Sequence, residues 1–166
     1  MKKGDKSGQH IMGLPFSIIF SIFLIVIFIV IAFIAIRSFL DFGKCGSVNK
    51  FYDNFQEKID EAWKSDSSEF DFKISLPSGI DMVCFADLES SSRGGEKEKE
   101  IYDEIELYRE ANTFLMPPGD SCNHEYENIK HINISEITKT KNPYCVYTSE
   151  KLRIKRDFYD PLVIVS

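Results

Sequence analysis

The sequence lacks the motifs by which catalytic and nucleic-acid-binding proteins are most readily identified. It contains no G-x-S-x-G, P-loop, G-x-G-x-x-G or H-E-x-x-H motif. It has no basic surplus, because 20 Lys and Arg stand against 26 Asp and Glu, and a net charge of −6 argues against nucleic acid as a partner. Histidine occurs three times, and no internal repeat is visible. We therefore predict no enzymatic activity, no cofactor, no metal and no small-molecule ligand.

One stretch of the chain is entirely without charge. Residues 14–36 contain 18 Leu, Ile, Val or Phe among 23 residues. As a helix this stretch is about 34 Å long, which matches a bilayer hydrocarbon core of about 30 Å. The stretch is too long for a cleaved signal, and no A-x-A-like site follows it. We predict a transmembrane helix over residues 14–36, preceded by a basic tail over residues 1–13.

The flanking charges leave the orientation of this helix undecided. Three lysines precede it, and Arg37, Lys44 and Lys50 follow it, so the positive-inside rule gives a tie. All four cysteines lie beyond the helix, which favours an oxidising compartment for that part. A glycosylation sequon at Asn133 is compatible with the same placement. We predict a single-pass protein of the cell membrane, with the N-terminus inside and the C-terminal domain outside.

The four cysteines allow more than one state. Two disulfides could connect them in three ways, and the ease of closing short loops favours Cys45–Cys84 with Cys122–Cys145. Free buried thiols are one alternative. A metal site of Cys122 and Cys145 with the nearby His124 and His131 is another, although the spacing fits no standard zinc site.

The N-terminal residues suggest a sorting signal. A basic leader is followed by Gly8-Gln9 and then by the apolar run. This arrangement resembles the class III signal of archaeal type IV pilin-like proteins, over about the first 40 residues. The resemblance implies cleavage after Gly8 and assembly through the N-terminal helix. The position that usually holds Glu in that family is Gly13 here, and that Glu aids assembly. The whole chain is otherwise similar to small single-pass archaeal membrane proteins of unknown function.

Three small residues recur at a spacing of four within the apolar run. Gly13, Ser17 and Ser21 fall on one face of the predicted helix. Small residues at this spacing allow two helices to approach closely in a membrane, so self-association or pairing with related subunits is one hypothesis. The alternative is that each serine bonds the carbonyl four residues before it.

The outer domain begins after a predicted hinge over residues 37–50, which contains Gly43 and Gly46. Ser47 or Asn49 can cap a helix that runs to about Lys64. Its apolar stripe consists of Phe51, Phe55, Ile59, Ala62 and Trp63, and we expect that stripe to pack on a sheet.

The rest of the domain has the pattern of short strands. Apolar and polar residues alternate over 69–76, and a turn at 77–79 leads to a returning strand over 82–86. Residues 89–100 are polar and predict a loop, and residues 101–110 fit either a helix or a strand. Further strands are predicted over 113–116, 129–134, 144–147, 151–155 and 162–165.

These patterns predict an α+β domain over residues 51–166, with one amphipathic helix on a mostly antiparallel sheet. The leading interpretation is a membrane-anchored surface protein with a disulfide-stabilised outer domain and a structural or binding role, whose partner is the lipid bilayer. The alternative is a pilin-like or pseudopilin subunit processed after Gly8. A membrane-tethered enzyme is a third interpretation, and no residue pattern supports it.

Overall fold

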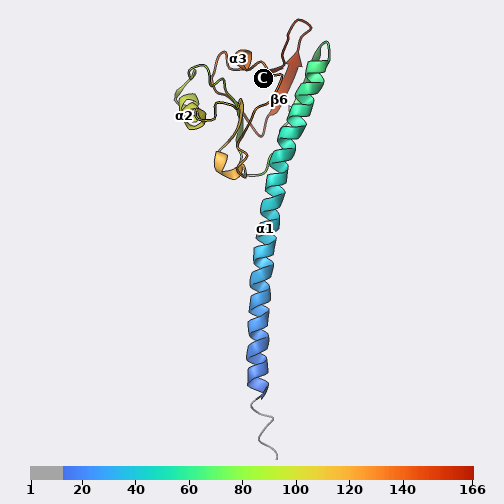
Figure 1. Ribbon diagram of the computed structural model, residues 1–166, viewed down its shortest axis with the longest axis vertical. Helices are drawn as coiled ribbons and strands as arrows, with labels where there is room; N and C mark the ends of the chain where they lie inside the picture. Colours follow the sequence, from blue (N-terminus) through green and yellow to red (C-terminus); the bar gives the residue numbers. More distant parts are fainter. Residues whose placement is uncertain (1–12) are drawn as a thin grey trace, which may run out of the picture. The chain divides into compact units, whose positions relative to one another are not determined.

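A computed structural model describes residues 13–166 (Figure 1). The chain forms two compact units, one that ends at Gly43 and one that covers Lys44–Ser166. The elements follow in the order α1 (Gly13–Lys64), β1 (Ser68–Lys73), β2 (Met82–Phe85), α2 (Glu96–Ile105), β3 (Thr113–Met116), the 3-10 turn η1 (Pro118–Asp120), β4 (Tyr126–Glu127), α3 (Ile134–Ile137), β5 (Tyr144–Tyr147), β6 (Lys151–Arg156) and β7 (Ile164–Val165).

In the first unit, α1 has no charged residue over residues 16–36. Side chains from Phe16 to Ile36 are exposed, and no charged residue lies between them. The predicted helix over residues 14–36 is therefore present, and it is long and apolar enough to cross a membrane. A helix of this kind has no charged face to turn toward water.

In the second unit, α1 places the predicted stripe in the core. Val48, Phe51, Phe55 and Ile59 are buried, while Trp63 lies at the margin. The spacing of these residues puts them on one helical face, so their burial supplies most of the packing energy of this part of α1.

The apolar face of α1 packs on two antiparallel sheets. One has the strand order β1-β6-β7 and the other β4-β3-β2-β5. Phe55 joins them, because its ring lies 5.3 Å from Phe72 on β1 and 5.9 Å from Phe85 on β2. The second sheet buries its other face as well, where Ile101 and Ile105 of α2 pack. Figure 1 shows α2 on the side of the domain away from α1. The fold is α+β, as predicted.

The expected break in the helix after the apolar run is absent. Gly43 and Gly46 lie inside α1, and the helix does not begin at Ser47 or Asn49. Neither glycine has a positive φ, and a Cβ added at either would meet nothing within 4 Å. Both are therefore ordinary helical glycines, each of which costs about 1 kcal/mol relative to Ala. The boundary between the two compact units nevertheless falls at Gly43, within the predicted 37–50 segment.

Several strands are confirmed, but their pairing differs from the expected order. β3 and β5 have the predicted bounds, β6 extends one residue further, and β7 pairs the end of the chain into a sheet. The strand over 82–86 does not return beside β1. Instead β1 pairs with β6, and β2 pairs with β3 and β5 in the other sheet.

Two predicted segments have a different structure. The predicted loop over 89–100 is helical from Glu96 onward, and the undecided segment 101–110 is helical as far as Ile105. Glu98 accepts a hydrogen bond from the Gly95 backbone N–H and caps α2. Residues 129–134 do not form a strand. Only Ile132 makes an isolated parallel bridge, to Val163, and α3 begins at Ile134.

Candidate functional site

A second stripe of α1, beside the apolar one, faces the segment 122–131. It consists of Cys45, Asn49, Tyr52, Gln56, Asp60 and Trp63. The spacing of three to four residues places these side chains on one helical face. Each makes a contact with the segment 122–131 or with a neighbouring loop, and together these contacts define a polar groove along the helix.

A disulfide closes one end of this groove. Cys45 is bonded to Cys122, and the second disulfide joins Cys84 to Cys145. The favoured pairing of Cys45 with Cys84 and Cys122 with Cys145 is therefore wrong. Cys84 and Cys145 are directly opposite each other on β2 and β5, so the strand register decides their pairing. Neither free thiols nor a cysteine metal site is present, because all four sulfurs are in disulfides.

Two side-chain amides form the hydrogen bonds to the backbone of residues 129 and 130 that a neighbouring strand would otherwise form. Asn112 accepts from the Ile129 N–H at 2.9 Å and donates to its carbonyl at 2.8 Å. Gln56 accepts from the Lys130 N–H at 2.8 Å and donates to its carbonyl at 3.4 Å. These hydrogen bonds satisfy the backbone N–H and carbonyl groups of both residues, which would cost free energy if they were left unpaired beside the buried Ile129 side chain.

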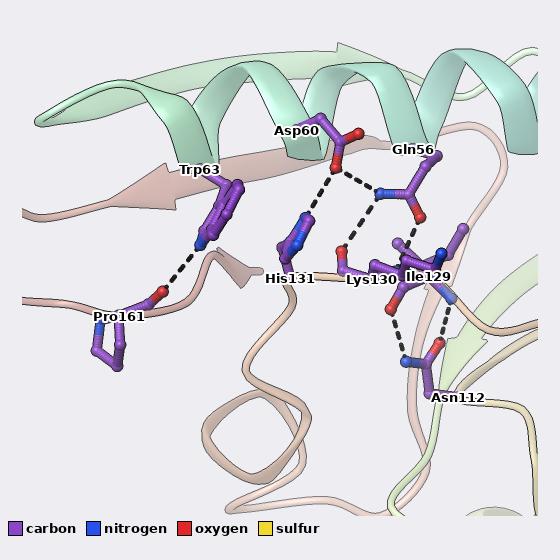
Figure 2. A network of polar contacts seen from close by, with 8 residues as sticks. All are labelled: Gln56, Asp60, Trp63, Asn112, Ile129, Lys130, His131 and Pro161. Carbon is purple, nitrogen blue, oxygen red and sulfur yellow. Dashed lines mark hydrogen bonds and ion pairs between the residues drawn. The ribbon is translucent and has the colours of Figure 1, made fainter.

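The far end of the groove is closed by an aromatic and ionic contact (Figure 2). The His131 Nδ1 lies 2.9 Å from a carboxylate oxygen of Asp60, and the Gln56 amide donates to the same oxygen at 2.8 Å. These bonds, with that of His131 the stronger influence, hold the pKa of Asp60 below its ordinary value. The Trp63 ring stacks on His131 at 3.8 Å, and its indole N–H donates to the Pro161 carbonyl at 3.2 Å.

Between the two ends of the groove, His124 connects α1 with the segment 122–131. His124 Nε2 lies 3.0 Å from the Glu127 carboxylate, and its Nδ1 lies 2.6 Å from the Asn49 amide. Because a carboxylate can only accept, Nε2 carries a proton. Nδ1 faces the oxygen of the Asn49 amide.

Tyr52 lies beneath His124, with ring centroids 5.0 Å apart. The Tyr52 side chain is buried, and its hydroxyl has no hydrogen-bond partner among the residues that the structure describes. Burial raises the pKa of this hydroxyl well above its ordinary value, and the nearby Glu127 and Glu125 carboxylates raise it further. The hydroxyl is therefore neutral at every physiological pH.

The groove encloses a hollow of about 500 Å³, whose lining includes Asn49, Tyr52, Asp53, His124 and Lys130. It offers amides, carboxylates and imidazoles at its surface, so it can contact polar groups. Within residues 13–166 no cluster of three His, Cys, Asp or Glu is placed to hold a metal ion. Cys122 cannot act as a nucleophile beside His124, because its sulfur is in a disulfide.

The other residues singled out in the sequence lie apart from the groove. Asn133 caps α3, where its side-chain oxygen accepts from the Glu136 N–H at 3.2 Å and from the Ser135 hydroxyl at 2.9 Å. Ser17 and Ser21 lie in α1, and the Ser21 hydroxyl donates to the Ser17 carbonyl at 2.8 Å. Gly13 is the first residue of α1, and the cleavage candidates Gly8 and Gln9 lie outside the described residues.

The spacing of polar residues along α1 was a sequence signal for the groove, but the apolar stripe of the same helix dominates the pattern. Polar residues recur at 45, 49, 52, 56 and 60 with the same period as the core residues. Asp60 belongs to this series, and it contacts His131. Comparisons of the sequence and structure with protein-family models, curated proteins and solved structures gave no match.

Proposed function

We propose that this protein is anchored in a membrane by the first part of α1 and presents its α+β domain on the oxidising side, where that domain has a structural or binding role. The observation that carries the proposal is the exposed apolar surface of α1 from Phe16 to Ile36. Transfer of such a helix into lipid gains on the order of 5 to 10 kcal/mol, and this value is an upper bound. In lipid the helix also satisfies its own backbone groups.

The disulfides support the placement of the domain. Both lie in the second unit, and both are long-range, joining residues 77 and 61 positions apart. Disulfides of this kind persist in secreted and extracellular proteins and are rare in reducing compartments. The N-terminus is then on the inner side of the membrane and the domain outside. The polar groove beside the second part of α1 is the surface to which we assign a binding role.

Fractionation and mass spectrometry test this proposal together. The full-length chain should remain with membranes after alkaline carbonate washing and should need detergent for extraction. Its intact mass without reduction should be four hydrogens below the fully reduced mass. Protease added to sealed cells or vesicles should cut the exposed segment 89–95 only where the outer face is accessible. A chain that is soluble without detergent, or that has four reactive thiols, would contradict the proposal.

A pilin-like subunit is a second proposal, favoured by the continuity of α1. The helix runs from Gly13 to Lys64 without interruption. One helix could thus act both as the membrane or assembly segment and as the packing helix of the domain. Processing after Gly8 predicts a mature chain that has lost eight residues, and the same intact-mass measurement detects it. An unprocessed N-terminus in the native membrane would leave the first proposal and exclude the second.

A further inference from the structure

One edge of the three-stranded sheet is open, whereas the opposite edge is covered. Beyond β7, the Val163 N–H donates to the His131 carbonyl at 2.8 Å, and the Asn133 N–H donates to the Val163 carbonyl at 2.7 Å. The segment 131–133 therefore covers that side. At the other side β1 is the last strand, and it pairs only with β6 in the part of the chain that the structure describes.

The hydrogen-bond pattern shows which backbone groups of β1 face outward. Arg153 exchanges both of its backbone hydrogen bonds with Ser166, on the β7 side. In an antiparallel sheet the residues of one strand alternate between its two neighbours. Arg153 is opposite Asp71 in the pairing of β6 with β1, so the N–H and carbonyl of Asp71 point away from β6. The same holds for Glu69 and Lys73.

These outward groups have no partner within residues 13–166, and the side chains of the same three residues are exposed. A hollow of about 250 Å³ lies between α1 and the end of β1, lined by Lys50, Asn54 and Lys73 among others. An open edge of six residues can accept another strand.

We propose that β1 pairs antiparallel with β1 of a second copy of this chain, with Glu69 opposite Lys73 and Asp71 opposite itself. The strand is acidic at its start and basic at its end, so a two-fold axis at Asp71 brings opposite charges together twice. Each outward residue exchanges two backbone hydrogen bonds with the residue opposite. On the inner face, Phe70 comes beside Phe72 of the other copy, a favourable cross-strand pair.

Neighbouring registers are less favourable. A shift that places Glu69 opposite Asp71 brings two acids together. A shift in the other direction places Asp71 opposite Lys73 twice, but it places Glu69 opposite Ser75, which lies beyond the end of β1 at Lys73, so fewer backbone hydrogen bonds can form. In the proposed register the Asp71 pair is the one unfavourable contact. Lys151 at 3.3 Å and Arg153 at 3.9 Å partly offset its charge within each copy.

The association should be weak. One pair of short strands buries less than the roughly 1,200 Å² of a stable interface. The opposed Asp71 carboxylates weaken it further, so a high protein concentration is needed for pairing. The proposal concerns the domain alone and does not depend on which side of the membrane it occupies.

Cysteine cross-linking of the full chain in detergent micelles tests the pairing, and micelles impose no common membrane plane on the two antiparallel copies. The Cα atoms of two opposed residues in a hydrogen-bonded pair lie about 5.5 Å apart, which is within the range of Cα–Cα distances across a disulfide. Mild oxidation of D71C should give a disulfide-linked dimer on a non-reducing gel. E69C alone should not, because its two copies would lie four residues apart, at about 13 Å. A mixture of E69C and K73C should form the mixed dimer.

Charge variants test the register without added cysteines. In sedimentation experiments, Glu69→Lys and Lys73→Glu should each weaken association about three- to tenfold, and the double exchange should restore it. Asp71→Asn should strengthen it. Association through the membrane helix would ignore these changes and leave the D71C thiols unlinked. A D71C chain with both native disulfides that stays monomeric, or a double exchange that does not recover, would overturn the proposal.

Discussion

Replacing Phe55 by Ala should remove a large part of the stability of the domain. The side chain is fully buried, and its ring lies within 6 Å of Phe51, Phe72 and Phe85. Loss of the apolar transfer energy costs about 2 kcal/mol. A residual cavity on the order of 100 Å³ costs a further 2.4 kcal/mol or so, at about 24 cal/mol per Å³. We expect a decrease of about 4 kcal/mol in the free energy of unfolding, out of a typical total of about 5–15 kcal/mol.

Urea denaturation of the full chain in detergent, with both disulfides intact, measures this decrease. Trp63 is the only tryptophan, and its stack on His131 makes its fluorescence a reporter of the folded domain. With a slope of about 2 kcal/mol per molar urea, the midpoint should fall by about 2 M. Phe158→Ala is the matched control, because that ring is 65% exposed and its loss should change stability by less than about 0.5 kcal/mol. Equal midpoints for the two variants would show that α1 does not pack on the sheets at Phe55.

Three further outcomes follow from particular contacts. Replacing Cys45 and Cys122 together by Ala should lower the free energy of unfolding by about 4 kcal/mol, because their bond closes a loop over 77 positions, and urea midpoints measure this. Because the pKa of Asp60 is lowered in the folded state, its carboxylate stabilises the fold above the unfolded pKa of about 4. This contribution is lost as pH falls through the lower folded pKa. The difference in free energy of unfolding between wild type and D60N should therefore shrink on acidification. Asn112→Ala should cost about 2 kcal/mol and speed hydrogen exchange at the Ile129 amide, whereas Asn54→Ala, at an exposed position of α1, should do neither.

The elements of the domain were largely predictable because their patterns are local. The helical stripe from Phe51 to Ala62 and the strands at 113–116 and 144–147 follow from periodicity, since buried faces require apolar residues at a period of 3.6 or 2. A period identifies which face of a strand is buried and carries no information about its neighbour. The pairing of β1 with β6, about eighty residues later, therefore could not be predicted.

The disulfide pairing was missed for a related reason. The preference for short loops rests on an entropy that changes by only about 0.6 kcal/mol for each doubling of loop length. Strand register and helix phase bring particular cysteines within bonding distance, and this proximity outweighs so small a preference. Cys84 and Cys145 are opposed on neighbouring strands, and Cys45 lies on the α1 stripe that faces residue 122.

The groove was missed because its polar contacts replace regular structure. Residues 129–134 have the apolar content of a strand, and Ile129 and Ile132 are buried as strand residues would be. Their backbone partners, however, include the side-chain amides of Gln56 and Asn112, which lie 74 and 17 positions away. Side-chain pairing of this kind leaves no periodic trace in either segment.

The two stripes of α1 constrain one another. Phe55 fixes the rotation of the helix against the sheets, and Gln56, the next residue, then faces Lys130. Successive residues of an α-helix differ by about 100° in direction. A rotation that improved the core would therefore remove the contacts of Gln56 and Asp60, and would carry Cys45 away from Cys122. The disulfide, the groove and the aromatic core are compatible with only one helical phase, so the geometry of the groove is as stable as the core beside it.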